Sequence, residues 1–167
     1  MAEVIDLDYS GKEPKVENVI AAVDCGVVVN PDSARNMGEG GIIDGIGNAF
    51  YGSLSFENGV PSSNNFDGYR MIRMREAPKH IDIHFVENNE DPTGLGEPLF
   101  PPVFAALSNA LYKATGKRSY DQPLLPNQSI LGEGTLRRLK SNRGLFYVSW
   151  KIKRLLLRFR SILGARH

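Results

Sequence analysis

Apolar and polar residues alternate along the first part of the chain, and this pattern predicts strands. Residues 2–9 alternate between apolar and acidic side chains, with Glu3 on the polar side, as in a half-buried strand. After a Ser-Gly-Lys-Glu-Pro turn, residues 15–24 form a second apolar run, so the two segments are expected to pair as a hairpin. Residues 79–87 alternate in the same way and predict a third strand.

A helix is expected to begin after three consecutive valines. These valines, at residues 27–29, form an apolar run that is expected to be buried. Asn30 or Asp32 can cap the helix, which then continues through the glycine-rich residues 39–52. Beyond it, residues 54–60 predict a short strand that leads into an Asn-Gly turn.

A second helix is predicted over residues 101–115, which are apolar on most sides. Pro101 and Pro102 suit its first turn, and Gly116 suits its C-terminal cap. The expected fold class is therefore α+β. A twisted, mostly antiparallel sheet would carry the two helices over residues 39–52 and 101–115.

The first helix carries glycines on one face, at positions 38, 41, 45 and 52. A glycine inside a helix costs about 1 kcal/mol relative to alanine, so this spacing requires a reason. One interpretation is a close contact with another helix or with the sheet. The other is the approach of a bulky ligand to the backbone.

A stiff loop holds one carboxylate just before the second helix. Gly94 and Gly96 allow a tight turn or a close approach of a ligand, and Glu97 follows them directly. Pro98 fixes its own φ and favours an extended conformation for Glu97. Glu97 is therefore a candidate for a chemically active carboxylate, and the alternative is a loop glutamate that faces solvent.

Basic residues concentrate at the end of the chain. Ten of the 20 Lys and Arg lie before residue 137, whereas all 19 acidic residues lie before residue 134, which gives net charges of −9 and +10 for the two parts. Composition predicts a domain over residues 1–120, a linker over 121–135 and a tail over 136–167.

The tail repeats apolar residues at helical spacing opposite basic ones, which predicts an appended basic amphipathic helix. Such a helix could lie on an anionic membrane surface, dock on a partner or pack on the acidic body of the protein. RNA binding is the remaining interpretation, although no nucleic-acid motif accompanies the charge.

Few residues suit metal binding. The single cysteine, Cys25, excludes an intrachain disulfide and a metal site made of cysteines alone. His80 and His84 share a face of the predicted strand but are too far apart to chelate a metal together easily, so they are expected to face solvent. The three arginines between residues 70 and 75 could hold phosphate, or they could be solvated or paired with acids.

The sequence shows no targeting segment of its own. The acidic start of the chain lacks the apolar core of a signal peptide, and no uncharged run approaches the ~20 residues of a membrane span. A cytoplasmic or membrane-associated location is therefore expected, and export together with a partner would also be compatible.

Several segments, in this order and spacing, resemble one known family. They are Ala22-Val23-Asp24-Cys25-Gly26, Glu39-Gly40-Gly41, Asn65-Phe66-Asp67-Gly68-Tyr69-Arg70, Arg73-Met74-Arg75 and Gly94-Leu95-Gly96-Glu97-Pro98. Together they resemble the C-terminal part of the molybdenum-binding subunit of xanthine dehydrogenase/aldehyde oxidase-type hydroxylases. Isoquinoline 1-oxidoreductases and bacterial aldehyde dehydrogenases are the most similar branches, and the resemblance covers about residues 1–120.

This resemblance implies a molybdenum–molybdopterin cofactor and the oxidation of aldehydes or N-heterocycles. Glu97 matches the family's catalytic glutamate, the general base that acts on a metal-bound hydroxyl. A glycine-rich helix start is also implied near the cofactor, where free N–H groups could meet it. The residues implied to border the cofactor are Met37, Gly38, Gly40, Gly41, Gly94 and Gly96, and no residue of the chain is implied to bind the metal itself.

The chain departs from the family in one residue and in length. Relatives usually carry Gln-Met-Glu-Gly-Gly, and Met37 stands at the glutamine position, where its thioether cannot donate a hydrogen bond. The family's subunit is several times longer, so the resemblance implies a partner chain with the rest of that subunit, and a further subunit with iron–sulfur clusters. The alternative is a truncated, catalytically inactive relative that serves as a structural or docking module.

Overall fold

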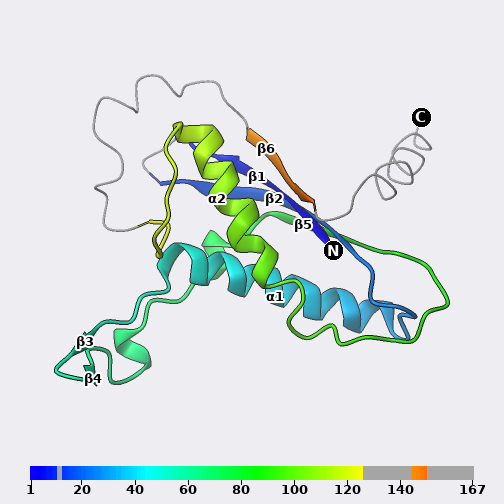
Figure 1. The fold of residues 1–167 in the computed structure, drawn as a ribbon, viewed down its shortest axis with the longest axis horizontal. Helices are drawn as coiled ribbons and strands as arrows, with labels where there is room; N and C mark the ends of the chain where they lie inside the picture. The colour runs from blue at the N-terminus through cyan, green and yellow to red at the C-terminus, as the bar shows by residue number, and fades with distance from the viewer. Residues whose placement is uncertain (11–12, 126–143, 150–167) are drawn as a thin grey trace.

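The computed structural model describes residues 1–10, 13–125 and 144–149. Their centre is a four-stranded sheet with the strand order β5-β2-β1-β6 (Figure 1). The two neighbours of β1 pair with it antiparallel, and β5 pairs with β2 parallel. The strands are β1 (Ala2–Asp8), β2 (Lys15–Val23), β5 (His80–Phe85) and β6 (Gly144–Ser149).

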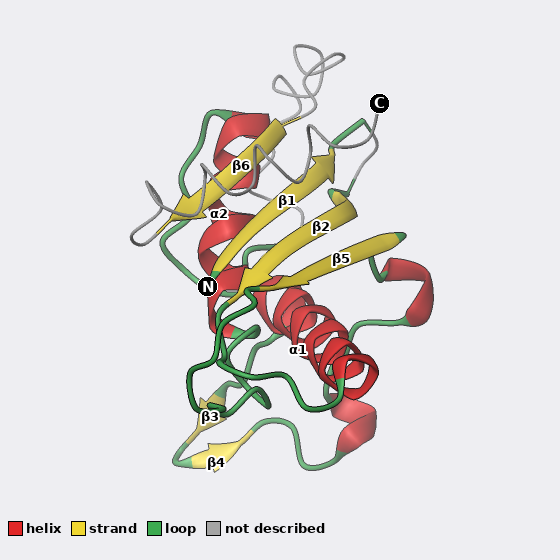
Figure 2. Cartoon of the chain, turned by 90° about the vertical axis from the view of Figure 1, so that its right-hand side faces the viewer, coloured by secondary structure: helices red, strands yellow, loops and turns green. Residues whose placement is uncertain are grey.

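The two long helices lie on one face of this sheet, and the α+β expectation is confirmed for the described residues (Figure 2). Helix α1 spans Pro31–Tyr51, and the Asn30 side chain caps it by accepting a hydrogen bond from the Ser33 amide at 3.0 Å. It begins directly after Asn30, one of the two predicted caps, and continues through the glycine-rich residues, because this cap and Pro31 in the first turn form a strong start signal. Helix α2 spans Pro101–Thr115 and ends at Gly116, as predicted.

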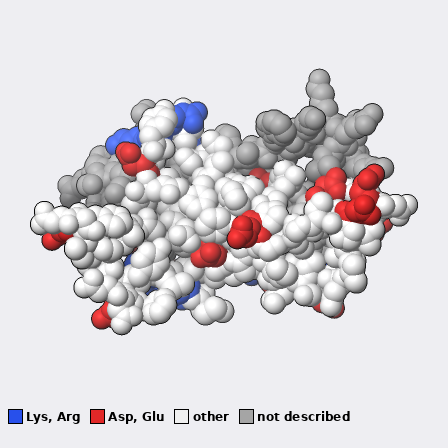
Figure 3. All heavy atoms as spheres, turned by 60° about the horizontal axis from the view of Figure 1, so that its bottom comes forward, with Lys and Arg blue, Asp and Glu red and all other residues white. Residues whose placement is uncertain are grey.

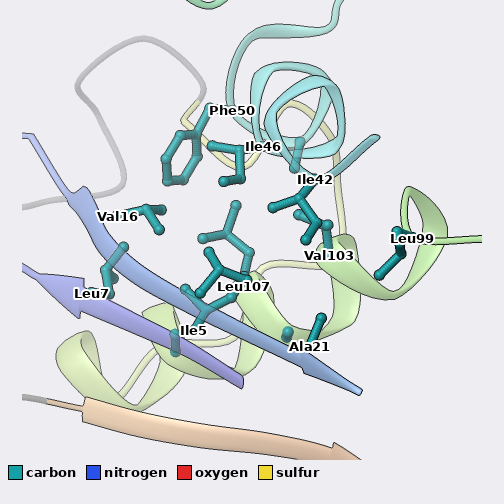
Figure 4. Packing of buried hydrophobic residues seen from close by; sticks show 14 of the residues in the cluster. Ile5, Leu7, Val16, Ala21, Ile42, Ile46, Phe50, Leu99, Val103 and Leu107 are labelled. Carbon is teal, nitrogen blue, oxygen red and sulfur yellow. The ribbon is translucent and has the colours of Figure 1, made fainter. Parts of the chain in front are cut away.

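The hydrophobic core fills the space between the sheet and the helices (Figure 4). Alternate residues of β1 face this core. The apolar face of α2, which includes the buried Leu107, packs against them from the other side. Fully buried residues of the core include Ile5, Leu7, Val19, Ile42, Ile46, Val103 and Leu107.

An arm, which we define as residues 53–76, projects from the C-terminal end of α1 (Figures 1 and 2). It contains the short strands β3 (Phe56–Glu57) and β4 (Val60–Pro61), joined by the predicted Asn-Gly turn. Two 3₁₀ turns follow, η1 (Phe66–Gly68) and η2 (Met74–Glu76). None of these 24 arm residues is buried.

Two expectations for apolar segments are corrected. The valine run is not buried, since Val27 is 43% exposed and Val29 is 85% exposed. The Val27 amide bonds to the Glu90 carbonyl in a neighbouring loop, and of the three valines only Val28 packs partly against the core. Within the predicted tail helix, residues 144–149 instead form β6 along the free edge of β1, where a strand satisfies backbone groups that a helix could not. The rest of that helix, at 136–143 and 150–167, lies outside the described residues.

Part of the predicted linker also packs on the body. The Leu124 side chain is buried, and its amide donates a 2.7 Å hydrogen bond to the carbonyl of Ala49 in α1. Among the described residues, none of the helices is both long and apolar enough to cross a membrane.

Candidate functional site

The loop that carries Glu97 is bonded to the loop between β2 and α1. The amide of Val27 donates to the Glu90 carbonyl at 3.1 Å, and the amide of Thr93 donates to the Cys25 carbonyl at 2.9 Å. β2 and β5 run parallel, so these two loops leave the sheet at the same edge, where the backbone bonds hold them together.

Gly26 lies at the centre of this junction and must be a glycine. Its φ is +72°, a conformation that costs other residues about 1–2 kcal/mol. A Cβ at this position would stand 2.2 Å from the carbonyl oxygen of Asp91, which is backbone and cannot rotate away. In the sequence, Gly26 was noted only as part of the Ala22–Gly26 family segment, although a glycine in the loop after β2 is typical of a turn that requires one.

Glu97 itself lies on the surface, immediately before α2. Its carbonyl accepts a 3.0 Å hydrogen bond from the amide of Phe100, which closes the turn into the helix. Leu99 is only 1% exposed and anchors this turn in the core. No described residue forms a hydrogen bond or an ion pair with the Glu97 carboxylate, so it can accept a proton or a hydrogen bond from outside.

Met37 and three of the predicted glycines lie open at this surface. The Met37 side chain is 47% exposed, and its Cε atom lies 3.7 Å from where a Gly96 Cβ would stand. Gly40 and Gly94 have no atom within 4 Å of such a Cβ. α1 therefore presents Met37 to the Glu97 loop, and the backbone at Gly40, Gly94 and Gly96 can be approached closely.

Gly38 and Gly41 are used differently, for packing inside the protein. A Gly38 Cβ would lie 2.7 Å from the terminal methyl carbons of both Ile83 and Leu99, and a Gly41 Cβ would lie 3.8 Å from the Phe100 amide. For this face of α1 the helix–sheet contact is therefore the correct interpretation. The expectation of free amides at a helix start is wrong, because both glycines lie more than one turn inside α1.

The other candidate residues do not form a metal site. No cluster of His, Cys, Asp and Glu among the described residues could hold a metal ion. The Nε2 atom of His84 lies 3.0 Å from a carboxylate oxygen of Asp82. Arg70 forms a 2.5 Å ion pair with Glu76, as expected for an arginine paired with an acid.

Glu3 carries a buried carboxyl, so the prediction that it lies on the polar side of the first strand is wrong. Its number has the same parity as Ile5 and Leu7, so β1 directs it into the core with them rather than to the polar side. The residue is fully buried, and neither carboxyl oxygen has a hydrogen-bond partner within the described part of the chain. Burial raises the pKa of Glu3 from 4.5 to about 8, so the carboxyl is protonated at neutral pH.

Comparison with known proteins gives one family. Residues 1–78 match the family model described as a molybdopterin cofactor-binding domain. The membrane-bound aldehyde dehydrogenase [pyrroloquinoline-quinone] of Gluconacetobacter polyoxogenes is 31% identical over 77% of this chain. The isoquinoline 1-oxidoreductase subunit beta of Brevundimonas diminuta is 33% identical over 66% of this chain.

A solved structure shares the fold. Quinoline 2-oxidoreductase from Pseudomonas putida 86 superposes over 76% of this chain with a TM-score of 0.63, at 19% sequence identity. The chain spans only 16% and 14% of the lengths of the two relatives and 17% of that structure.

Proposed function

Residues 1–78 belong to the molybdopterin cofactor-binding domain family, and on this premise we propose that the chain is part of a molybdenum-dependent hydroxylase or dehydrogenase. Its substrates would be aldehydes or N-heterocycles, the classes named in the two relatives. Glu97 would be the general base. The observation that carries this proposal is the unpaired Glu97 carboxylate, held at the surface by a loop that two backbone hydrogen bonds and Gly26 fix in place.

The open residues fit one wall of a cofactor site. Backbone without side chains at Gly40, Gly94 and Gly96 leaves room for a flat, polar group to lie against the protein. Met37 adds an apolar contact beside Gly96. Gly38 is not available for this purpose, because Ile83 and Leu99 occupy its space, and Gly41 faces Leu99 and Phe100 rather than an open surface.

When bound, the molybdenum cofactor would supply the redox chemistry, which no side chain can perform. The residues of this chain would supply position and proton transfer. The Glu97 carboxylate would accept a proton from the attacking oxygen, a contribution of about 10²–10⁴ in rate for a positioned general base. Leu99 and the Phe100 hydrogen bond would keep that carboxylate at a constant distance from the cofactor.

The rest of the site would come from polypeptide outside these residues. The described part offers the Glu97 carboxylate on one open face, whereas a ligand site normally encloses most of its ligand. Larger relatives carry most of their length outside the matching segment, which supports a shared site. The single cysteine of the chain cannot hold an iron–sulfur cluster, so the electrons would leave through a subunit that carries one.

The proposal is tested by Glu97→Gln in the native complex that contains this chain. We expect turnover to fall by about 10²–10⁴, while molybdenum content stays constant, because the amide cannot accept the proton. Glu90→Gln is the matched control, since Glu90 is an exposed carboxylate on the same loop. Equal turnover of Glu97→Gln and the wild type would show that Glu97 is not the base.

Met37 supports a second candidate function, a catalytically inactive module. Its thioether accepts only weakly and donates nothing at the position where relatives usually carry glutamine. We expect Met37→Gln to raise the molybdenum and pterin content of the purified complex, and Met37→Leu to leave it unchanged. Elemental analysis that finds no molybdenum in the wild type or in Met37→Gln would favour the inactive module.

A further inference from the structure

The arm exposes more apolar surface than a free loop needs. Phe66 is 87% exposed and Met74 is 90% exposed, and four further apolar side chains of the arm are at least half exposed. These are Leu54, Phe56, Val60 and Met71. Large exposed apolar side chains concentrated in one segment of the chain indicate surface that another polypeptide covers.

The conformation of the arm does not depend on these apolar side chains. The Ser62 amide donates to the Ser55 carbonyl at 2.8 Å, and the Ser63 hydroxyl donates to the Gly68 carbonyl at 3.1 Å. At the base, the Arg70 guanidinium lies 4.1 Å from the centre of the Tyr51 ring. Polar contacts thus hold the arm in shape, and its apolar side chains remain available for contact with a partner.

A pocket of about 310 Å³ opens where the arm joins the body. Leu54 and Tyr69 of the arm line it, together with Phe104 of α2 and the amides of Asn48 and Gln122. Its lining is about equally apolar and polar, with Leu54, Tyr69 and Phe104 on one hand and Asn48, Ser53 and Gln122 on the other, and it is open to solvent. It therefore suits a large side chain with an apolar body and a polar tip, inserted from a neighbouring segment.

The charged residues of the arm indicate what kind of partner surface would fit it. Arg73 and Arg75 stand on either side of Met74 in the sequence, both are exposed, and neither forms an ion pair with a described residue. The face shown in Figure 3 carries scattered acidic residues and few basic ones, and uncharged residues make up most of it. A complementary surface would be apolar at its centre, with acidic residues opposite the two arginines.

We propose that the arm is the docking site for the remainder of the molybdenum-binding subunit, and that one large side chain of that remainder fills the pocket at the arm's base. This rests on the proposed function, because the two relatives carry more than four fifths of their length outside the segment that matches this chain. The occupant is thus the large polypeptide that corresponds to that remaining length.

The test uses the full 167-residue chain and a defined probe. The probe is the polypeptide that co-purifies with this chain from its native complex, separated from the chain before the assay. Phe66→Cys and, separately, Met74→Cys are labelled with maleimide, with and without the probe. Tyr120→Cys is the matched control, because Tyr120 is 88% exposed and lies outside the arm. Peptide mass spectrometry reads each position.

We expect the probe to slow labelling at positions 66 and 74 by about ten-fold or more, and to leave position 120 unchanged. Phe66→Ser should weaken binding of the probe by about ten-fold, and Tyr120→Ser should not. No binding, or binding without protection of the arm, would overturn the proposal. Protection that depends on the concentration of the chain alone would also overturn it, because the occupant would then be a second copy.

These readings are independent of catalysis. If the arm is labelled freely in a bound complex whose turnover depends on Glu97, the docking proposal fails and the proposed function stands. If the arm is protected, but native complexes contain no molybdenum and Glu97→Gln leaves their turnover unchanged, the proposed function fails and the docking surface stands.

Discussion

At the scale of single residues, the position of Glu97 depends on a glycine that performs no chemistry. Gly26 brings the loop after β2 against the backbone of Asp91, six residues before the carboxylate. The same φ of +72° occurs at Gly116, but there a Cβ would meet nothing within 4 Å. The two positions therefore separate the effect of backbone strain from the effect of a collision.

We predict that Gly116→Ala lowers the free energy of unfolding by about 1–2 kcal/mol, the cost of the left-handed conformation alone. Gly26→Ala should lower it further, because its Cβ would stand 2.2 Å from the Asp91 carbonyl oxygen. Urea unfolding measures both. Hydrogen exchange should also show faster exchange at Val27 and Thr93 in Gly26→Ala only, and equal losses in the two variants would contradict the contact.

Residue identities could be predicted from sequence where the local chain determines them. Asn30 caps α1 and Gly116 ends α2 because such signals act within a few residues. The roles of Gly38 and Gly41 could not be decided in this way, since Ile83 and Leu99 come from distant parts of the chain. Glu3 has an odd residue number, like the buried Ile5 and Leu7, and this alternation alone places it on the buried face of β1. The prediction placed it on the polar face because glutamate is acidic.

At the scale of elements, the arm and the core differ in what their apolar residues do. Leu107 is fully buried between α2 and the sheet, whereas Phe66 and Met74 are exposed to solvent in the arm. The sequence predicted the arm's Asn-Gly hairpin, because turn chemistry is local. It did not predict that the following aromatic and methionine residues would stay exposed, since an apolar residue in a sequence is normally assigned to a core.

We predict that Phe66→Ser and Met74→Ser each change the free energy of unfolding of the isolated chain by less than about 0.5 kcal/mol. Leu107→Ala should lower it by about 2–5 kcal/mol, because it leaves a cavity in the core. Thermal or urea unfolding distinguishes these cases. A loss above 1 kcal/mol for either arm variant would mean that the arm packs on the rest of this chain instead.

At the scale of the whole molecule, Glu3 makes stability depend on pH. The folded state keeps a proton on Glu3 up to about pH 8, whereas the unfolded chain releases it near pH 4.5. Within that window the folded state binds more protons, so the free energy of unfolding falls as pH rises, by up to ~1.4 kcal/mol per unit. Above the window the effect of Glu3 is constant.

We predict that Glu3→Gln removes this decline, so that the variant gains stability relative to the wild type between pH 5 and pH 8. Glu17→Gln is a useful contrast, because the Lys79 ammonium lowers the pKa of Glu17. The ionised Glu17 carboxylate therefore stabilises the fold at neutral pH, and this contribution is lost only when acid protonates it. Urea unfolding at several pH values checks both, and parallel profiles for the wild type and Glu3→Gln would contradict the raised pKa of the buried Glu3 carboxyl.

The architecture was predictable in class but not in all its pairings. Strong periodic patterns gave β1, β2, β5 and the two helices, and motif order gave the family. The strand at residues 144–149 was missed, because its pairing with β1 is a long-range contact that outweighs a helical spacing. The open face beside Glu97 was likewise beyond local reasoning, since it needs the positions of α1 and two loops together.

The parallel pairing of β2 with β5 also has a consequence for folding kinetics. Val23 pairs with Phe85, and α1 and the whole arm lie between them in the chain. Closing so long a loop costs entropy before any contact compensates for it, so this register raises the contact order and should form late. The loops that hold Glu97 leave from these two strand ends. The Glu97 carboxylate therefore reaches its position in the folded structure only in molecules that have completed this pairing, and a half-folded chain would not present the proposed base.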